Sequence, residues 1–355
     1  MIESFSVMSD YLYSLNPPLS IVVASRNDNH GGNILDRMRL FVDGLLTQTR
    51  RFRLHAELIF VEWNPPRDRL PLADILPAPS SGDVLEIRFV RVPEEIHNSF
   101  GRGREIPLYQ MIAKNVGIRR AKGEFILCTN IDLLFSDELF AFLAKGELDA
   151  DVFYRCNRVD VPSAILPEWT WEQKMAFCRK NERKRLGKDS LHRNLFGMKP
   201  WIYDYPVFSR SLNFAMKHVR KWMQNPVKRR LLDLDTNACG DFTLMSRKAW
   251  MDIGGYVELD LYSIHIDSLA LVAAAALGYR QEILSREKCT YHMDHPAGWE
   301  SMTPLEKVRF LSRRPGLGYD IVWEVGMQVL NSGEKFQLNG ENWGFADLTF
   351  EEWKR

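Results

Sequence analysis

The sequence predicts an α/β protein in which a mostly parallel central sheet is flanked by helices. Through the first 150 residues, short apolar runs rich in β-branched residues alternate with longer stretches whose apolar residues recur at helical spacing. The same alternation returns after residue 238. Because parallel strands are joined by helices that cover the sheet, this order of elements favours a sheet buried on both faces.

The individual elements follow from local patterns along the chain. The apolar run 19–24 follows two prolines and predicts a buried strand, and Asn64-Pro65-Pro66 ends the strand that begins at residue 57. Apolar residues recur every three to four positions in 33–46, which predicts a helix. Ser136 is expected to cap the helix that follows it. The expected strands are 19–24, 57–61, 85–92, 124–128 and 242–246, and the expected helices are 33–46, 107–121, 136–145, 247–253 and 268–277.

Composition and charge exclude several classes of protein. The 355 residues are 45% hydrophobic and 26% charged, which is ordinary for a globular protein with its own core. The net charge of +1 gives no electrostatic case for a nucleic-acid partner. The beginning of the chain contains acids and lacks the basic and apolar regions of a signal peptide, and no apolar run is long enough to cross a membrane.

The five cysteines predict free thiols. Their number is odd and none lies in a C-x-x-C pair, which argues against a disulfide framework and against a cysteine-based zinc cluster. We therefore expect a reducing compartment and a cytoplasmic protein.

The stretch 113–132 carries the most informative pattern. A helix ends, Gly123 turns the chain, a buried strand follows, and Asn130 and Asp132 come at the carboxyl end of that strand, where parallel sheets bind their ligands. Carboxylate oxygens at this place can hold Mg²⁺ or Mn²⁺, and the metal neutralises charge that develops on a leaving diphosphate. The alternative is a turn in which Asn130 and Asp132 cap the next helix.

This stretch resembles the family 2 glycosyltransferases of the GT-A fold, a Rossmann-like α/β fold, whose pattern is R-N-x-G-x-x-x-A-x-G-x-(Y/F)-(I/L) followed by D-x-D. Lys114 stands in place of the arginine, and Asn130-Ile131-Asp132 stands in the D-x-D position. Because an amide brings no charge, Asp132 is expected to be the principal metal ligand. The resemblance covers roughly residues 19 to 295 without the basic middle of the chain. The direct matches are Asn115, Gly117, Ala121, Gly123, Glu124 and Phe125.

The resemblance implies a nucleotide-sugar site and a divalent cation, Mn²⁺ or Mg²⁺. The segment 21–28 is similar to the opening strand of the family, and Glu62 falls where the family has an acid that reads the nucleotide base. A UDP-sugar donor and transfer with inversion are implied as well. The implied nucleotide-binding residues are Ser25, Asn27, Asp28, Glu62, Lys114, Asn115 and Asn130, and the implied metal ligands are Asp132, His292 and His295, with Asn130 beside them.

Two carboxylates are candidates for the catalytic base, which takes the proton from the attacking acceptor hydroxyl. Asp267 matches the aspartate of the family's E-D motif, with Ile266 in place of the glutamate; the alternative is a cap on the apolar helix that follows. Asp241, at the opening of an expected strand, is the second candidate. For His292 and His295, the alternative to a ligand role is a pair of surface histidines on one turn.

The chain is expected to divide into a nucleotide-binding half, 19–135, an acceptor half, 136–300, and a closing extension, 301–355. The acceptor half contains a helical basic insertion, 174–230, with 16 Lys and Arg against three acids. This insertion either presents solvated helix faces or binds an anionic acceptor, such as a lipid-linked diphosphate or an acidic polysaccharide. The segment 216–232 is a candidate for peripheral contact with an anionic membrane surface, at the inner face of a membrane.

The expected activity is metal-dependent transfer of a sugar from a nucleotide-sugar to a glycan or lipid-linked acceptor. A nucleotidyltransferase acting on a sugar phosphate is the first alternative; it predicts a glycine-rich basic loop after the first strand, of which 25–32 is a faint version. A non-catalytic relative that binds a nucleotide-sugar or a glycan is the second alternative.

Overall fold

The computed structural model describes residues 18–188, 190–193, 233–295, 303, 305, 309, 316–332 and 337–355. The candidate membrane segment 216–232 and most of the basic insertion lie outside these ranges. The strands are β1 (Leu19–Ser25), β2 (Ala56–Trp63), β3 (Leu85–Val92), β4 (Phe125–Thr129), β5 (Leu133–Phe135), β6 (Val152–Arg155), β7 (Asn157–Val161), β8 (Lys184–Gly187), β9 (Ser190–Arg193), β10 (Phe242–Ser246), β11 (Arg280–Ile283), β12 (Cys289–Met293) and β13 (Glu351–Lys354). The helices are α2 (Ile34–Phe52), α3 (Leu72–Ile75), α4 (Glu94–Asn98), α5 (Gln110–Arg120), α6 (Asp137–Ala144), α7 (Trp171–Lys180), α10 (Arg247–Ile253), α11 (Ile266–Ala276) and α13 (Tyr319–Ser332).

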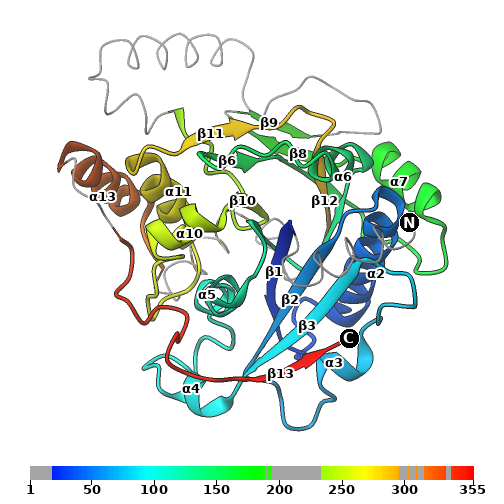
Figure 1. Cartoon of the computed structure of the whole chain (residues 1–355), viewed down its shortest axis with the longest axis horizontal. Helices are drawn as coiled ribbons and strands as arrows, with labels where there is room; N and C mark the ends of the chain where they lie inside the picture. The colour runs from blue at the N-terminus through cyan, green and yellow to red at the C-terminus, as the bar shows by residue number, and fades with distance from the viewer. Residues whose placement is uncertain are drawn as a thin grey trace, which may run out of the picture.

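An eight-stranded mixed sheet in the order β11-β6-β10-β4-β1-β2-β3-β13 forms the centre of the molecule (Figure 1). β3, β2, β1 and β4 run parallel to one another. β10 runs antiparallel between β4 and β6, and β13 runs antiparallel along β3. The expected α/β architecture is confirmed, and the order of the four parallel strands is compatible with a Rossmann-like, doubly wound sheet.

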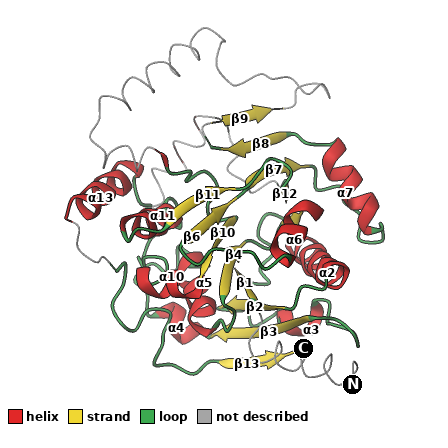
Figure 2. Ribbon diagram, turned by 45° about the horizontal axis from the view of Figure 1, so that its top comes forward, coloured by secondary structure: helices red, strands yellow, loops and turns green. Residues whose placement is uncertain are grey.

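Helices cover both faces of this sheet (Figure 2). Ile21 and Val23 of β1 lie in the core beneath α2 and α6, while Val22 and Ala24 lie in the core beneath α5, α10 and α11. Successive side chains of a strand point to opposite faces, so a strand covered on both sides needs an uninterrupted apolar run. This requirement explains the apolar run 21–24 in β1.

A second, five-stranded sheet in the order β5-β12-β7-β8-β9 begins where the central strands end. Asn130, Ile131 and Asp132 link β4 of the first sheet to β5 of the second, and Cys156 alone separates β6 from β7. Within the second sheet, β12 pairs with β5 on one side and β7 on the other. The second sheet therefore stands at the carboxyl ends of the central strands.

Two expectations about the elements are corrected by the structure. α2 continues to Phe52 instead of ending at 46, because the polar residues that interrupt its apolar pattern are buried: Gln48 Nε2 donates to the carbonyl of Phe135, and Thr49 Oγ1 donates to the carbonyl of Leu45. The described part of the basic insertion is not helical throughout, since β8 and β9 form a hairpin that extends the second sheet from β7.

Two smaller expectations are confirmed. Ser136 caps α6, with its Oγ accepting a hydrogen bond from the amide of Leu139 at 3.2 Å. The five cysteines are buried free thiols. Among the described residues, no helix combines the length and the apolar character needed to cross a membrane.

Candidate functional site

The order of the strands marks one place on the sheet as the natural ligand site. From β1 the chain continues through α2 to β2 on one side, whereas β4 lies on the other side of β1 and is reached from β3 through α5. The order of the strands thus reverses direction between β1 and β4, and we call this place the reversal. Doubly wound sheets bind ligands outside the carboxyl ends of the strands at such a reversal. The segments 26–33, after β1, and 130–132, after β4, begin at this place.

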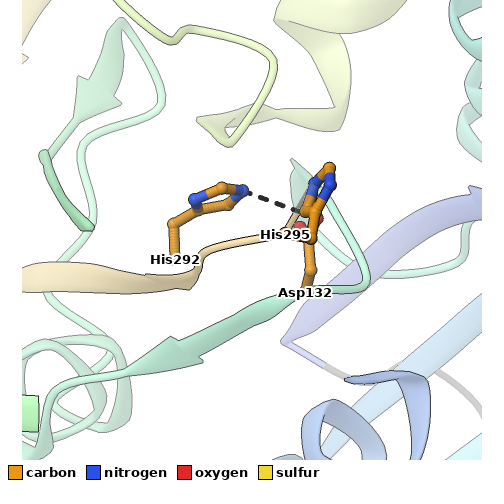
Figure 3. A group of neighbouring side chains, drawn as sticks. All are labelled: Asp132, His292 and His295. Atoms are coloured by element: carbon orange, nitrogen blue, oxygen red, sulfur yellow. Dashed lines mark ion pairs between the residues drawn. The ribbon is translucent and has the colours of Figure 1, made fainter. Parts of the chain in front are cut away.

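Asp132, His292 and His295 converge at this reversal (Figure 3). Asp132 comes from the link between β4 and β5, His292 from β12, and His295 from just beyond β12. The Oδ2 atom of Asp132 lies 3.5 Å from Nε2 of His292 and 3.4 Å from Nε2 of His295. One ligand atom from each side chain fits within a group no wider than 4.8 Å.

The Asp132 carboxylate is buried among cationic groups. It is 9% exposed, and Arg37 of α2 donates from Nη1 to Oδ2 at 3.3 Å. Burial alone raises the pKa of Asp132, but the charges and hydrogen bonds of His292 and His295 outweigh it and hold that pKa well below its usual range. Oδ1 of Asp132 is buried and has no hydrogen-bond partner among the described residues.

The second ring nitrogen of His292 contacts a carboxylate. His292 Nδ1 lies 3.2 Å from Oδ1 of Asp160 on β7, the strand paired with β12. Burial lowers the pKa of His292, whereas the carboxylates of Asp132 and Asp160 raise it, and the net result is about 9. Burial likewise opposes ionisation of Asp160, but His292 and Arg158 lower its pKa to about 2.

Arg158 connects this pair to Asp241. Its Nε donates to Asp160 Oδ1 at 2.6 Å and its Nη1 donates to Asp241 Oδ2 at 3.0 Å. Asp241 is buried and directly precedes β10, whose antiparallel pairing with β4 brings residue 242 opposite Thr129. This pairing explains why two segments more than 100 positions apart in sequence meet at the site.

Asn130 is fixed by three hydrogen bonds. Its amide oxygen accepts from Lys114 Nζ and from Gln110 Nε2, both at 2.8 Å, and its amide nitrogen donates to Asp241 Oδ1 at 2.6 Å. An ammonium group can only donate, so the oxygen of Asn130 must face Lys114. Both lone pairs of that oxygen are occupied, which leaves none for a cation and argues against Asn130 as a metal ligand. Its expected role in nucleotide binding stays a prediction.

Lys114 extends the network towards Asp267. The Lys114 side chain is fully buried in α5 and donates from Nζ to the carbonyl of Gly240 at 2.9 Å. Burial lowers the pKa of Lys114, and the nearby Cys128, Asp241 and Asp267 oppose that shift. Asp267 Oδ2 lies so near Gly240 that a Cβ there would approach it to 3.0 Å. Both candidate bases therefore lie beside the same buried cation.

The alternatives to functional roles are not borne out by the geometry. Asn130 and Asp132 lead into β5, and Ser136 caps the next helix instead. His265, in a left-handed conformation, is the N-cap of α11, and Asp267 lies inside its first turn. His292 is buried on a strand and is not a surface histidine.

The residues predicted to bind the nucleoside follow β1 and β2. Asn27 Nδ2 donates to the carbonyl of Leu70 at 3.1 Å, and Asp28 Oδ1 accepts from the amide of His30 at 3.0 Å. Ser25 and Glu62 are both buried and lie opposite each other at the ends of the paired strands. Glu62 Oε1 accepts from the amide of Leu72 at 2.9 Å, and burial raises the Glu62 pKa above its usual value.

Asn115 is not part of the network around Asp132. Its amide nitrogen donates to the carbonyl of Tyr256 at 2.7 Å and to Glu258 Oε1 at 2.9 Å, and its amide oxygen accepts from the amide of Tyr256 at 2.8 Å. These bonds hold the turn Gly254-Gly255-Tyr256 against α5. The structure thus gives Asn115 a structural role, and its nucleotide-binding role remains untested.

The residues at the reversal fit a divalent transition metal. The donor set contains one carboxylate, with a buried oxygen that lacks a partner, and two imidazoles. Mg²⁺ prefers oxygen ligands, whereas imidazole suits first-row transition ions, so the set fits a transition metal such as Mn²⁺ better than Mg²⁺.

Four residues of this site were not anticipated from the sequence, namely Arg37, Gln110, Arg158 and Asp160. In comparisons with known proteins, no family model matches the chain and no curated protein matches it.

Proposed function

We propose that the chain is a metal-dependent glycosyltransferase of the GT-A type, which transfers a sugar from a UDP-sugar to a glycan or lipid-linked acceptor. The observation that carries the proposal is the convergence of Asp132, His292 and His295 at the reversal of a doubly wound sheet. The resemblance of 113–132 to family 2 glycosyltransferases supports the same activity. We also propose a cytoplasmic location, on the basis of the five buried free thiols.

Each part of the site has a role in this proposal. Asp132, His292 and His295 hold the cation, which when bound neutralises charge on the leaving diphosphate. Ser25, Asn27, Asp28 and Glu62 bind the nucleoside at the ends of β1 and β2. Asp267 accepts the proton of the acceptor hydroxyl, with Asp241 as the second candidate. Lys114 holds Asn130 and the Gly240 carbonyl in place between these two carboxylates.

A thermal-shift panel of nucleoside diphosphates with and without Mn²⁺ tests the proposal. A ligand that binds the native state raises the melting temperature by mass action. We expect UDP to stabilise the chain in the presence of Mn²⁺ and to do so far less after Asp132→Ala. Indifference to every nucleotide contradicts the proposal and leaves a protein that binds glycans without catalysis.

Turnover assays with UDP-sugars then separate the remaining alternatives. A glycosyltransferase releases UDP, whereas a nucleotidyltransferase acting on a sugar phosphate releases pyrophosphate from a nucleoside triphosphate. We expect Asp267→Asn to abolish UDP release while the UDP-induced shift in melting temperature remains. Unchanged turnover in Asp267→Asn removes the base assignment and directs attention to Asp241.

A further inference from the structure

We propose that Asp160, held by Arg158, is a positioning residue that orients His292 for metal binding. The inference rests on the proposed metal-dependent function and assigns to it a residue outside the ligand set. Asp160 is 6% exposed, and among the described residues its side chain contacts His292 and Arg158.

The register of the second sheet fixes the arrangement. His292 on β12 lies directly opposite Asp160 on β7 and opposite Leu133 on β5, the residue after Asp132. Side chains of directly paired residues project to the same face of a sheet. The strands thus hold the imidazole between two carboxylates, with Nε2 towards Asp132 and Nδ1 towards Asp160.

The chemistry of imidazole makes the second contact consequential. A histidine that binds a metal through Nε2 carries its proton on Nδ1, and that proton needs an acceptor. Asp160 Oδ1, 3.2 Å from Nδ1, is such an acceptor. Arg158 Nη2, which can only donate, also lies 2.9 Å from Nδ1 and favours the opposite form, with the proton on Nε2. In the proposal, Asp160 decides this competition in favour of the form of His292 whose Nε2 lone pair is available to a cation.

Arg158 increases the expected effect of losing Asp160 on metal binding. Its Nη2 lies 2.9 Å from His292 Nδ1, while its Nε holds Asp160 Oδ1 at 2.6 Å. If Asp160 were absent, the guanidinium, which can only donate, would be left beside Nδ1. It would then donate to Nδ1 and favour a neutral imidazole with its proton on Nε2, the form that cannot bind the cation. Loss of Asp160 thus removes an acceptor and also leaves a competing donor in place.

Isothermal titration of Mn²⁺ into the full chain without nucleotide tests the inference. We expect Asp160→Ala to weaken Mn²⁺ binding by roughly 10- to 100-fold, the usual effect of removing such a partner. Asp160→Asn keeps an oxygen that can accept from Nδ1, so its Mn²⁺ affinity should stay within a few-fold of the wild type. If Asp160→Ala fails to fold, Asp160→Ser replaces it, because a hydroxyl on so short a side chain cannot reach Nδ1.

Glu182→Ala is the matched control. Glu182 pairs through Oε2 with Arg185 Nη2 at 3.0 Å, and Arg185 lies on β8, the neighbour of β7 in the same sheet. We expect a similar loss of melting temperature in this control with unchanged Mn²⁺ affinity. A merely structural role for Asp160 predicts equal Mn²⁺ affinity in all four proteins.

The outcomes distinguish this inference from the proposed function. Wild-type affinity for Mn²⁺ in Asp160→Ala overturns the positioning role, while the response of the wild type to UDP and Mn²⁺ still supports the function. Equal losses in Asp160→Ala and Asp160→Asn also overturn it, because they point to charge and not to the hydrogen bond. A wild type that binds no Mn²⁺ overturns both.

Discussion

At the scale of single residues, Asn130 shows how a departure from a motif can be stabilised by its surroundings. The amide oxygen faces Lys114 and Gln110, and the amide nitrogen faces the Asp241 carboxylate. A carboxylate at this position would replace a donor by an acceptor in front of Asp241. The asparagine therefore fits a site that already contains Asp132, Asp160 and Asp241.

Asn130→Asp is consequently expected to destabilise the protein without improving metal binding. It converts the 2.6 Å hydrogen bond to Asp241 into a contact between two acceptors, at a cost of about 1–3 kcal/mol. Urea unfolding measures the loss of stability, and isothermal titration measures the Mn²⁺ affinity, which should not rise. A tenfold tighter affinity would show that position 130 does supply a ligand.

Glu62 gives a prediction about pH. Burial raises its pKa in the folded state, so ionised Glu62 lowers stability at neutral pH, and this cost disappears as pH falls below the usual glutamate pKa of about 4.3. Glu62→Gln keeps an oxygen for the Leu72 amide and removes the charge. We expect a higher melting temperature than the wild type at pH 7 and a smaller difference near pH 4.

Thermal unfolding at the two pH values checks this expectation. The exposed Glu124 provides the control, because Glu124→Gln should leave the melting temperature nearly unchanged at both. A lower melting temperature for Glu62→Gln at pH 7 contradicts the prediction.

Asp132, Asp241 and Asp267 could be predicted from the sequence, but Arg158 and the carboxylate of Asp160 were missed. Arg158 and Asp160 lie in 152–161, where Val159 and Val161 alternate with them at the two-residue period of a strand. This alternation places both polar side chains on one face, and it could have predicted a strand that presents Arg158 and Asp160 together. The pairing of β7 with β12 could not be predicted from the sequence, because it joins segments more than 120 positions apart.

At the scale of elements, the longer strands of the central sheet were predicted and the shorter strands were missed. β1 and β4 are mostly apolar and β3 alternates apolar with charged residues, and all three were expected within a residue or two of their observed bounds. The second sheet was missed because its strands are short and include charged residues; β5 has three residues, and β8 has the sequence Lys-Arg-Leu-Gly. Short strands with one polar face give little periodic signal.

Close packing of α5 on the central sheet explains the glycine at position 117 of the stretch 113–132. A Cβ at this position of α5 would lie 2.5 Å from Cγ1 of Val22 and 3.3 Å from Cγ2 of Val61, both buried in the central sheet. Gly117→Ala should therefore destabilise the protein by about 1–3 kcal/mol through overpacking, despite the better helix propensity of alanine. Urea unfolding measures the change.

Gly340→Ala is the control for Gly117→Ala, because a Cβ at residue 340 would meet no atom within 4 Å. Its unfolding free energy should match that of the wild type. If Gly117→Ala is as stable as this control, α5 can shift on the sheet, and the motif glycine is not required for packing.

At the scale of the whole molecule, the candidate metal centre exists only when the chain is folded. Asp132 and His292 are 160 positions apart in sequence, and the two sheets bring them together. A cation that binds only the folded chain stabilises it by about 2.7 kcal/mol at 100 times its dissociation constant. We expect Mn²⁺ to raise the melting temperature, EDTA to reverse the shift, and Mg²⁺ to have a smaller effect.

Scanning fluorimetry over a Mn²⁺ titration measures this shift. His295→Ala removes one of the three ligands and should shift the titration to higher Mn²⁺ concentration. A melting temperature that ignores Mn²⁺ in the wild type contradicts the assignment of the metal centre.

The shortness of the connections between the two sheets has a consequence for how a substrate reaches the site. Three residues connect β4 to β5 and one connects β6 to β7. These linkers are too short to allow a hinge motion that would move the two sheets apart. We therefore expect entry and exit to depend on rearrangement of the 26–33 loop, which runs from the first strand into α2. The radius of gyration in solution should stay the same whether or not a nucleotide is bound.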